Sequence, residues 1–260
     1  MLFRSVKNDI YTNRVFLKKI SVITINYNNK KGLENTIKSV ICQRGVDFEY
    51  IIIDGGSTDG SKELMLQYQE QLSYSVSEKD EGIYHAMNKG IQKAVGTYLL
   101  FINSGDYLHD NESLKRLLEN GENKDIIYGN ILVVEEKRKN WIKTYPSNLS
   151  IDYFLIATLP HPASLIKKDL FRITGLYDQT KKIVSDWQFF MDIICLHHAS
   201  YKWVDNTISC FLLDGISSKK ENIQRILLEK KAHIDNSYSD YLKENNLKFP
   251  FKKPSKFKKL

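Results

Sequence analysis

The stretch YIIIDGGSTDGS, residues 50–61, contains the pattern that decides the fold. Four apolar or aromatic residues suited to a buried strand run into a polar, glycine-rich turn at Asp54, and a helical pattern starts at Ser61. The same strand and polar turn recur at residues 20–25 and 97–102. A strand, loop and helix repeated at roughly 20 to 30 residue intervals predicts an α/β fold, with a mainly parallel central sheet flanked by helices.

Polar and acidic residues follow the ends of successive predicted strands. Asp54 follows one strand, Asp80 lies between the next strand and its helix, and Asp106 ends the segment NSGD. In open parallel sheets, loops and helix N-termini converge at the carboxyl ends of the strands, and ligands bind there. One Asp-Gly cluster would indicate only a good turn. Three such loops predict a single site at this edge of the sheet.

The composition excludes several classes of protein. The 260 residues are 42% hydrophobic and 27% charged, which is typical of a globular protein and not of a disordered or collagen-like one. The formal charge is +7, but residues 249–260 carry +5 and residues 1–20 carry +4, so the remainder carries −2. A neutral to acidic body with two basic ends argues against a nucleic-acid-binding face across the fold.

Cysteine usage and hydropathy favour a cytoplasmic location. Cys42, Cys195 and Cys210 are odd in number and widely spaced, which fits a reducing compartment and indicates neither a disulfide framework nor a zinc site. The N-terminus lacks the apolar segment of a signal peptide. No stretch approaches 18 consecutive apolar residues, so we expect no transmembrane helix.

The second half of the chain is less regular than the first. Residues 125–134 predict a long strand or a strand pair, and residues 202–208 and 209–213 predict two more strands. Ser185 or Asp186 suits the N-cap of a helix. Residues 221–242 carry an apolar stripe at helical spacing. We therefore expect one domain with a C-terminal helical extension.

Five motifs carry a resemblance to a known family. In order, they are SVITINYNNKKGLENTIKSVICQ, FEYIIIDGGSTDGS, EKDEGIYHAMNKGIQKAVGTYLLFINSGD, HPASLIKKDLFRITGLYD and VSDWQFFMDI. The chain resembles the family 2 glycosyltransferases of the GT-A (nucleotide-diphospho-sugar transferase) fold, which is Rossmann-like. The resemblance implies an inverting enzyme that moves a sugar from a nucleotide diphosphate to an acceptor, with Mn²⁺ or Mg²⁺ as cofactor.

The GIY-x-AMNKGI segment is similar to that of transferases that build bacterial surface polysaccharides, such as O-antigen, capsule, exopolysaccharide or lipopolysaccharide. This implies a hexosyl- or N-acetylhexosaminyltransferase that uses a UDP-sugar and a saccharide or polyprenyl-linked saccharide acceptor. The resemblance also suggests the domain limits. They are a basic N-terminal extension (1–19), a GT-A domain (20–218) with a nucleotide-binding half (about 20–110) and an acceptor-binding half (about 111–218), a C-terminal helix (219–248) and a basic tail (249–260).

The resemblance places the donor-binding residues at the polar strand ends. Asp54 corresponds to the strand-end Asp that binds the nucleobase, and its carboxylate can accept the imide N–H of uracil. Tyr27 corresponds to an aromatic residue that can stack on the base. Asp80 is a second candidate for the base or the ribose, and Asn88 and Ser104 complete the donor-binding set.

Asp106 is the expected metal ligand. The segment Ser104-Gly105-Asp106 matches the D-x-D motif, with Gly105 where many members carry a second acid, so we expect metal binding to rest on Asp106 alone. A hard divalent ion commonly takes one or two carboxylates and completes its shell with phosphate oxygens. Bound to the diphosphate, the ion would neutralise charge on the departing nucleotide.

Asp186 corresponds to the general base of the family. In an inverting transfer, a carboxylate removes the proton of the acceptor hydroxyl as that oxygen attacks the anomeric carbon opposite the leaving phosphate. A position at a helix N-terminus favours the anion. The alternative is that Asp186 serves only as an N-cap.

Three further residues are candidates for contacts with the acceptor, the donor sugar or the diphosphate. His85 replaces an Asp that many relatives carry and either contacts the donor sugar or lies on the helix surface. His161, in a Pro-His-Pro turn, faces the acceptor or diphosphate or has a structural role, and Trp187 follows the general base. Near residues 211–218, where several relatives carry a metal- or phosphate-binding His, this chain has Asp214 and Ser217.

The sequence is compatible with other functions. A nucleotidyltransferase would need a glycine-rich, basic first loop, and NYNNKKG contains only Gly32. A non-catalytic sugar-nucleotide-binding protein would result if Gly105 disables the metal site. The tail 249–260 alternates lysines with large apolar residues and suits an anionic inner-membrane surface, so peripheral attachment to its cytoplasmic face is one expectation and a solvated tail the other.

Overall fold

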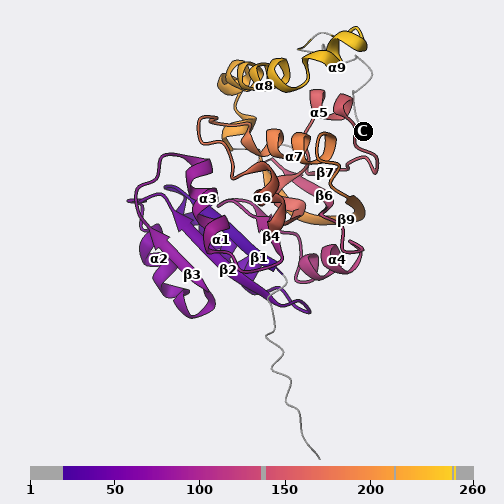
Figure 1. The fold of residues 1–260 in the computed structure, drawn as a ribbon. Coiled ribbons are helices and arrows are strands. Elements are labelled where there is room, and N and C mark those ends of the chain that lie inside the picture. Colours follow the sequence, from indigo (N-terminus) through magenta and orange to yellow (C-terminus); the bar gives the residue numbers. More distant parts are fainter. Residues whose placement is uncertain (1–19, 136–138, 214, 248, 250–260) are drawn as a thin grey trace, which may run out of the picture.

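The computed structural model describes residues 20–135, 139–213, 215–247 and 249 (Figure 1). The first half contains β1 (Ile20–Asn26), α1 (Lys30–Ile41), β2 (Phe48–Asp54), α2 (Ser61–Gln67), β3 (Tyr74–Ser77), α3 (Ile83–Lys93), β4 (Tyr98–Phe101), β5 (Tyr107–Leu108) and α4 (Ser113–Glu119). The second half contains β6 (Ile126–Val134), β7 (Trp141–Lys143), α5 (Ile151–Ile156), β8 (Ser164–Lys167), α6 (Phe171–Thr174), α7 (Ser185–Cys195), β9 (Tyr201–Leu212), α8 (Ile223–Ser237) and α9 (Ser239–Glu244).

The described strands form one sheet in the order β3-β2-β1-β4-β8-β6-β9-β5, with β7 paired to β6. The first four strands are parallel, with Asn26 opposite Asp54 and Ile23 opposite Phe101. Parallel strands end at one edge, so the loops after β1, β2 and β4 lie together. Helices flank this sheet (Figure 1), and the predicted α/β class is confirmed.

The sheet is mixed, which corrects the expectation of a mainly parallel one. β8 is antiparallel to β4 and β6, β5 is antiparallel to β9, and β7 is antiparallel to β6. β6 and β9 are parallel to each other. An apolar run identifies a buried strand but does not reveal its direction, which depends on the connections between strands.

Two segments differ in extent from their predictions. The region expected to form two strands is the single strand β9. The expected C-terminal helix, 219–248, is two helices that meet at Tyr238, whose hydroxyl donates to Asp192 of α7 at 2.8 Å. Lys248, the basic tail from residue 250 and the basic extension 1–19 lie outside the described residues.

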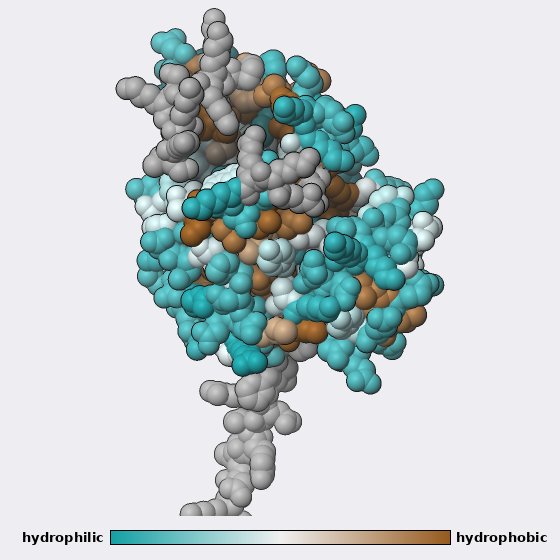
Figure 2. Space-filling model, turned by 180° about the vertical axis from the view of Figure 1, so that it is seen from behind, coloured by the Kyte–Doolittle hydropathy of each residue, from teal (hydrophilic) through white to brown (hydrophobic). Residues whose placement is uncertain are grey.

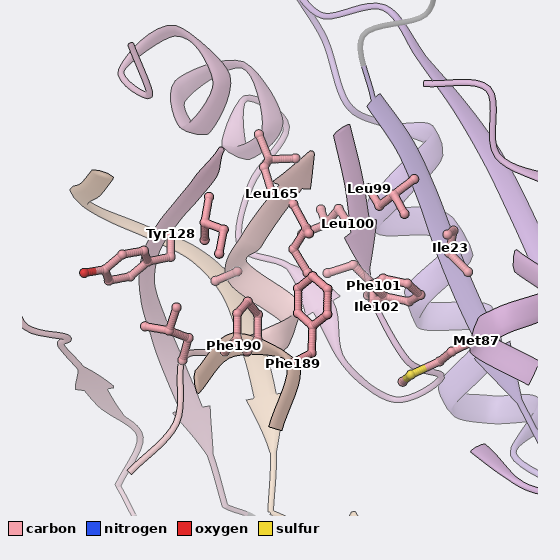
Figure 3. Close-up of a cluster of buried hydrophobic side chains, with 14 of the residues drawn as sticks. Ile23, Met87, Leu99, Leu100, Phe101, Ile102, Tyr128, Leu165, Phe189 and Phe190 are labelled. Carbon is pink, nitrogen blue, oxygen red and sulfur yellow. The ribbon is translucent and has the colours of Figure 1, made fainter. Parts of the chain in front are cut away.

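Aromatic side chains fix α7 against the sheet. Figure 3 shows Phe189 and Phe190 among side chains of the central strands, including Leu165 and Leu100. Phe189 stacks on Phe171 with ring centroids 4.4 Å apart. Burying a side chain of this size contributes about 1.5–3 kcal/mol. The helix that carries the predicted base is therefore rigidly placed.

The first turn of α7 differs in one detail from the sequence prediction. The helix begins at Ser185, with Val184 in the cap position and without a side-chain cap hydrogen bond. Asp186 is therefore the second residue of the helix and is not its N-cap. This removes the N-cap alternative for Asp186.

The helices, the reverse face and the cysteines each bear on how the protein meets its surroundings. In the part of the chain that the structure describes, no helix is long and apolar enough to cross a membrane. The reverse face is mostly hydrophilic, with hydrophobic groups gathered between hydrophilic regions (Figure 2). Cys42, Cys195 and Cys210 are free thiols, so no disulfide joins these elements.

Candidate active site

Asp54 ends β2, and its carboxylate is enclosed by hydrogen bonds from neighbouring strand ends. Its side chain is fully buried, and its carboxylate accepts hydrogen bonds from Asn26 Nδ2 (2.6 Å), Ser77 Oγ (2.6 Å), and both N–H (2.9 Å) and Oγ (2.5 Å) of Ser57. Burial alone would raise the pKa of Asp54, but these hydrogen bonds bring it below its ordinary value. The carboxylate oxygens of Asp54 thus accept hydrogen bonds that join the ends of β1, β2 and β3. This geometry argues against the prediction that Asp54 contacts the base.

Tyr27, Gly55 and Asp80 meet beside this buried carboxylate. The Tyr27 side chain is 68% exposed. A Cβ atom at Gly55 would lie 2.5 Å from Asp80 Oδ2 and 3.2 Å from Tyr27 Cδ2. Asp80 Oδ1 accepts a hydrogen bond from Gly82 N–H at 2.9 Å, which orients the carboxylate. An exposed aromatic ring next to an oriented carboxylate suits a nucleobase with an N–H donor.

If the site takes UDP, as the resemblance implies, Gly55→Ala should weaken UDP binding about tenfold or more. The added methyl group would displace the Asp80 carboxylate or the Tyr27 ring, and one hydrogen bond to a charged group contributes about 1.5–3 kcal/mol. Isothermal titration calorimetry with UDP and Mn²⁺ measures the change. Inorganic pyrophosphate, which lacks a base, should bind the variant as it binds the wild type. Equal UDP affinities would contradict a base site at Gly55.

The turn after β4 supplies oxygen atoms that fit a divalent ion. Asp106 is buried, and its Oδ1 accepts from Leu212 N–H of β9 at 3.0 Å. Asn103 Oδ1 is buried without a hydrogen-bond partner among the described residues. Carboxylate and amide oxygens are ligands that Mg²⁺ and Mn²⁺ accept. No cluster of three or more His, Cys, Asp or Glu in the described ranges could hold a metal, so substrate and water would supply most ligands.

Ser104 and Gly105 shape this turn through their backbones. The Ser104 carbonyl accepts from Asn29 Nδ2 at 3.0 Å, and its N–H donates to Ile25 O at 3.0 Å. Gly105 has φ +109°, a conformation that residues with a Cβ rarely adopt. Its N–H donates to Thr36 Oγ1 at 3.1 Å. The turn therefore requires glycine where many relatives carry a second acid, and Ser104 acts as part of the turn.

Asn88 has a structural role, which argues against its predicted contact with the donor. It is 2% exposed, its Nδ2 donates to Tyr177 O at 2.8 Å, and its Oδ1 accepts from Tyr177 N–H at 3.0 Å. Both ends of the amide are thus bound to one backbone unit. Asn88 joins α3 to the segment that precedes α7.

Asn88→Ala is expected to lower the free energy of unfolding by about 2–4 kcal/mol, because two hydrogen bonds are lost and both backbone groups of Tyr177 stay buried without partners. Urea unfolding monitored by circular dichroism measures this. Asn120→Ala, at the exposed end of α4, is the control and should change stability by less than about 1 kcal/mol. A similarly small effect at position 88 would contradict the structural role.

Tyr84, which the sequence analysis did not single out, holds Asp186 in place. Its phenol donates to Asp186 Oδ1 at 2.9 Å and accepts from Ser185 N–H at 3.0 Å. Burial, and next the charge of Asp186, raises the pKa of Tyr84 well above its ordinary value, so the phenol keeps its proton. No described residue donates a hydrogen bond to Asp186 Oδ2. One carboxylate oxygen is therefore fixed and the other is available to a ligand.

A cavity of about 370 Å³ opens beside Asp186. Its lining is largely apolar and comes from β6, β9, α7 and α8. Phe211 and Leu213 both line it, and Leu212 between them donates to Asp106. The cavity therefore extends from the predicted base to the end of β9, whose backbone binds the predicted metal ligand. Ser217 also lines it, whereas Asp214 lies outside the described residues.

His161 and Trp187 line this cavity, and both also hold the fold together. His161 stacks on Phe101 with ring centroids 4.7 Å apart, and its Nε2 shares a hydrogen bond with Tyr177 Oη at 3.0 Å. Burial lowers the pKa of His161, opposed by the charge of Asp186, which favours the neutral ring. Trp187 Nε1 donates to Phe154 O at 2.7 Å. Any ligand contact would use their exposed edges only.

His85 lies away from the cavity. Its Nδ1 accepts from Glu81 N–H at 2.9 Å, at the start of α3. It lines a much smaller hollow of about 10 Å³ with Lys181 and Lys182. The structure thus favours the surface alternative for His85.

A second cavity is not lined by the predicted site residues. It measures about 520 Å³ and lies at the amino-terminal side of β4, between Thr97 and Lys115. The smaller cavity beside Asp186 is therefore the candidate active site.

The family can be stated from the sequence match. Residues 21–198 match the family model described as Glycosyl transferase family 2. The chain belongs to glycosyl transferase family 2. It is therefore a glycosyltransferase, as the motifs predicted. The match ends before β9 and α8, which contribute to the cavity.

Curated relatives are glycosyltransferases. The chain is 26% identical over 208 residues to the PGL/p-HBAD biosynthesis glycosyltransferase of Mycobacterium tuberculosis (strain ATCC 25177 / H37Ra), covering 72% of this chain and 79% of the relative. It is 31% identical over 214 residues to an uncharacterized glycosyltransferase of Mycobacterium tuberculosis (strain ATCC 25618 / H37Rv), covering 78% of each.

Solved structures confirm the GT-A fold. S. aureus TarS 1–349 in complex with UDP-GlcNAc is similar with a TM-score of 0.64 and 19% identity, covering 84% of this chain and 67% of that one. The mannosyltransferase PcManGT from Pyrobaculum calidifontis, in complex with GDP-Man and Mn²⁺, is similar with a TM-score of 0.64 and 15% identity, covering 87% and 66%. The chain spans 45% of the longer TarS chain.

Proposed function

We propose that this glycosyltransferase inverts the anomeric centre and moves a hexosyl or N-acetylhexosaminyl group from a UDP-sugar to an acceptor hydroxyl. The observation that carries the proposal is that the Asp186 carboxylate lies at the cavity with only one of its two oxygens hydrogen-bonded to a described residue. Tyr84 fixes Oδ1, and no described residue donates to Oδ2. A positioned carboxylate with one available oxygen suits a general base.

The donor would bind along the carboxyl edge of the sheet. Tyr27 stacks on the base, and the Asp80 carboxylate accepts its imide N–H, which favours uracil over cytosine or adenine. Asp106 and Asn103 would hold a divalent ion, which would supply positive charge to the departing nucleotide. UDP-GlcNAc in TarS supports a uridine nucleotide, whereas GDP-Man in PcManGT shows that the fold alone does not select the base.

The transfer step follows from the position of Asp186. Asp186 Oδ2 accepts the acceptor hydroxyl proton as that oxygen forms its bond to the anomeric carbon. The bond from that carbon to the phosphate oxygen breaks on the opposite side, and its electron pair leaves with UDP. Tyr84 keeps Oδ1 in a hydrogen bond throughout, so Asp186 does not have to reorient.

The acceptor is proposed to be a saccharide or a lipid-linked saccharide of bacterial surface polysaccharide or glycolipid synthesis. A relative named for PGL/p-HBAD biosynthesis and the largely apolar cavity support an acceptor with an apolar part. We place the reaction on the cytoplasmic face of the inner membrane. The basic tail that would attach the protein there lies outside the described residues, apart from Phe249.

A thermal-shift panel of nucleotide sugars with Mn²⁺ tests the proposed donor. A ligand at 100 times its Kd stabilises the folded state by about 2.7 kcal/mol, which for a chain of this size raises Tm by about 5–10 °C. We expect UDP-sugars, and not GDP- or dTDP-sugars, to give this shift, and EDTA to reduce it. A shift with GDP-sugars alone would contradict the uridine assignment.

A further inference from the structure

Helix α8 lies beyond the family match and packs directly on the segment that carries the base. Glu229 accepts hydrogen bonds from the backbone N–H groups of Lys182 (3.0 Å) and Ile183 (3.1 Å), just before α7. His233 Nε2 lies 2.8 Å from Asp192 Oδ1 of α7. The helix is thereby fixed at both ends of α7, and the side chains between these anchors have defined positions at the cavity.

Lys230 is the cation that α8 places at the cavity wall. It lines the cavity with Asp186, and its Nζ lies 4.4 Å from the centroid of the Trp187 ring. It makes no hydrogen bond or ion pair with any described residue. Burial lowers the pKa of Lys230 to about 8, although the charge of Asp186 opposes this, so most of it is protonated at neutral pH.

The N–H donors of this partly buried ammonium are available to an anionic ligand, because no described side chain accepts a hydrogen bond from them. The remaining cavity wall adds Lys143 as a second cation, and Asp186 is its only acidic side chain among the described residues. The other contacts are mainly apolar, including Ile226 and Phe211. The wall therefore matches a ligand that combines an apolar body with an anionic group.

We propose that Lys230 and Trp187 form an anion-binding subsite beside the base, which takes a phosphate or carboxylate group attached to an apolar body. The subsite deepens the proposed function and rests on it for its role in transfer. Two ligands carry this chemistry, an anionic acceptor and the diphosphate of the donor. The ammonium donates hydrogen bonds to the anionic oxygens, Trp187 holds the ammonium in place through its ring, and the apolar wall covers the remainder of the ligand.

Calorimetric titration of the full chain with phenyl phosphate, benzyl alcohol and UDP with Mn²⁺ tests this subsite. Lys230→Met should weaken phenyl phosphate or UDP binding by about 10- to 100-fold, as expected for a lost hydrogen bond to a charged group. Lys230→Arg should restore much of that binding. Lys231→Met is the matched control, because Lys231 is exposed and pairs with Asp235. Benzyl alcohol should bind all variants equally, and unchanged melting temperatures would show that they fold.

The arms of the experiment separate the two sources. Weakened phenyl phosphate binding with unchanged UDP binding assigns the subsite to an anionic acceptor, and weakened UDP binding assigns it to the donor diphosphate. If neither ligand depends on Lys230, the proposal is overturned. Failure of the proposed function would appear separately, as absent nucleotide-sugar binding by the wild-type protein.

Discussion

Replacing Asp186 with Asn is expected to lower kcat for sugar transfer by about 10²- to 10⁴-fold, which is the usual contribution of a general base. Asn keeps the size of the side chain and can still accept from Tyr84 through its amide oxygen, but it cannot take the proton of an acceptor hydroxyl. Rates of UDP release in the presence of acceptor measure the loss. UDP binding should change little, because the proposed contacts of UDP, at Tyr27, Asp80 and the ion at Asp106, do not include Asp186.

Tyr84→Phe provides a graded comparison for this prediction. The variant keeps the Asp186 carboxylate but removes the phenol that donates to Oδ1, so we expect a smaller loss of kcat, about tenfold, with little change in the KM of the donor. Wild-type turnover by Asp186→Asn would remove Asp186 from the role of base. A loss in Tyr84→Phe as large as that in Asp186→Asn would show that Tyr84 does more than position the carboxylate.

Asp106→Asn is expected to reduce Mn²⁺-dependent UDP binding by about 10- to 100-fold. Mutating a residue that only hydrogen-bonds to a metal ligand already lowers metal affinity by about this factor. The substitution keeps an oxygen that can accept from Leu212 N–H and removes only the charge. Titration of UDP with and without Mn²⁺ separates the metal-dependent part. Asp235→Asn, an exposed acid on α8, is the control. A Mn²⁺ dependence equal to that of the wild type would exclude Asp106 as a metal ligand.

The sequence was sufficient for the features that depend on local patterns. Apolar runs located β1, β2 and β4 to within about two residues, and the polar residues that follow these strands lie at one edge of the sheet, as expected. Such runs reflect burial on both faces, which is a property of neighbouring residues. The direction of β8 and β5 could not be predicted in this way, because it depends on connections that the pattern does not record.

Individual roles within the site depended on contacts between distant residues. Asp54 and Asp80 look alike in the sequence, yet one is enclosed by four hydrogen bonds and the other lies beside an exposed ring. Tyr84 and Asp186 are 102 residues apart, so no local spacing could connect them. The GIY segment drew attention to this region through its resemblance, but only the folded chain shows what the tyrosine holds.

Lys230 illustrates the same limit for α8. Its helical stripe predicted a helix that packs on the domain, but the lysine belongs to the polar positions that a sequence pattern assigns to solvent. Only the anchoring of α8 by Glu229 and His233 brings its ammonium to the cavity.

The release of UDP from a panel of UDP-hexoses and UDP-N-acetylhexosamines, measured with and without Mn²⁺, distinguishes a metal-dependent UDP-sugar transferase from the alternatives. We expect the full chain to release UDP from at least one of these donors, EDTA to suppress the release, and Asp186→Asn nearly to abolish its stimulation by an acceptor. Turnover of GDP- or dTDP-sugars in place of every UDP-sugar, or release that is unaffected by EDTA, would contradict this expectation.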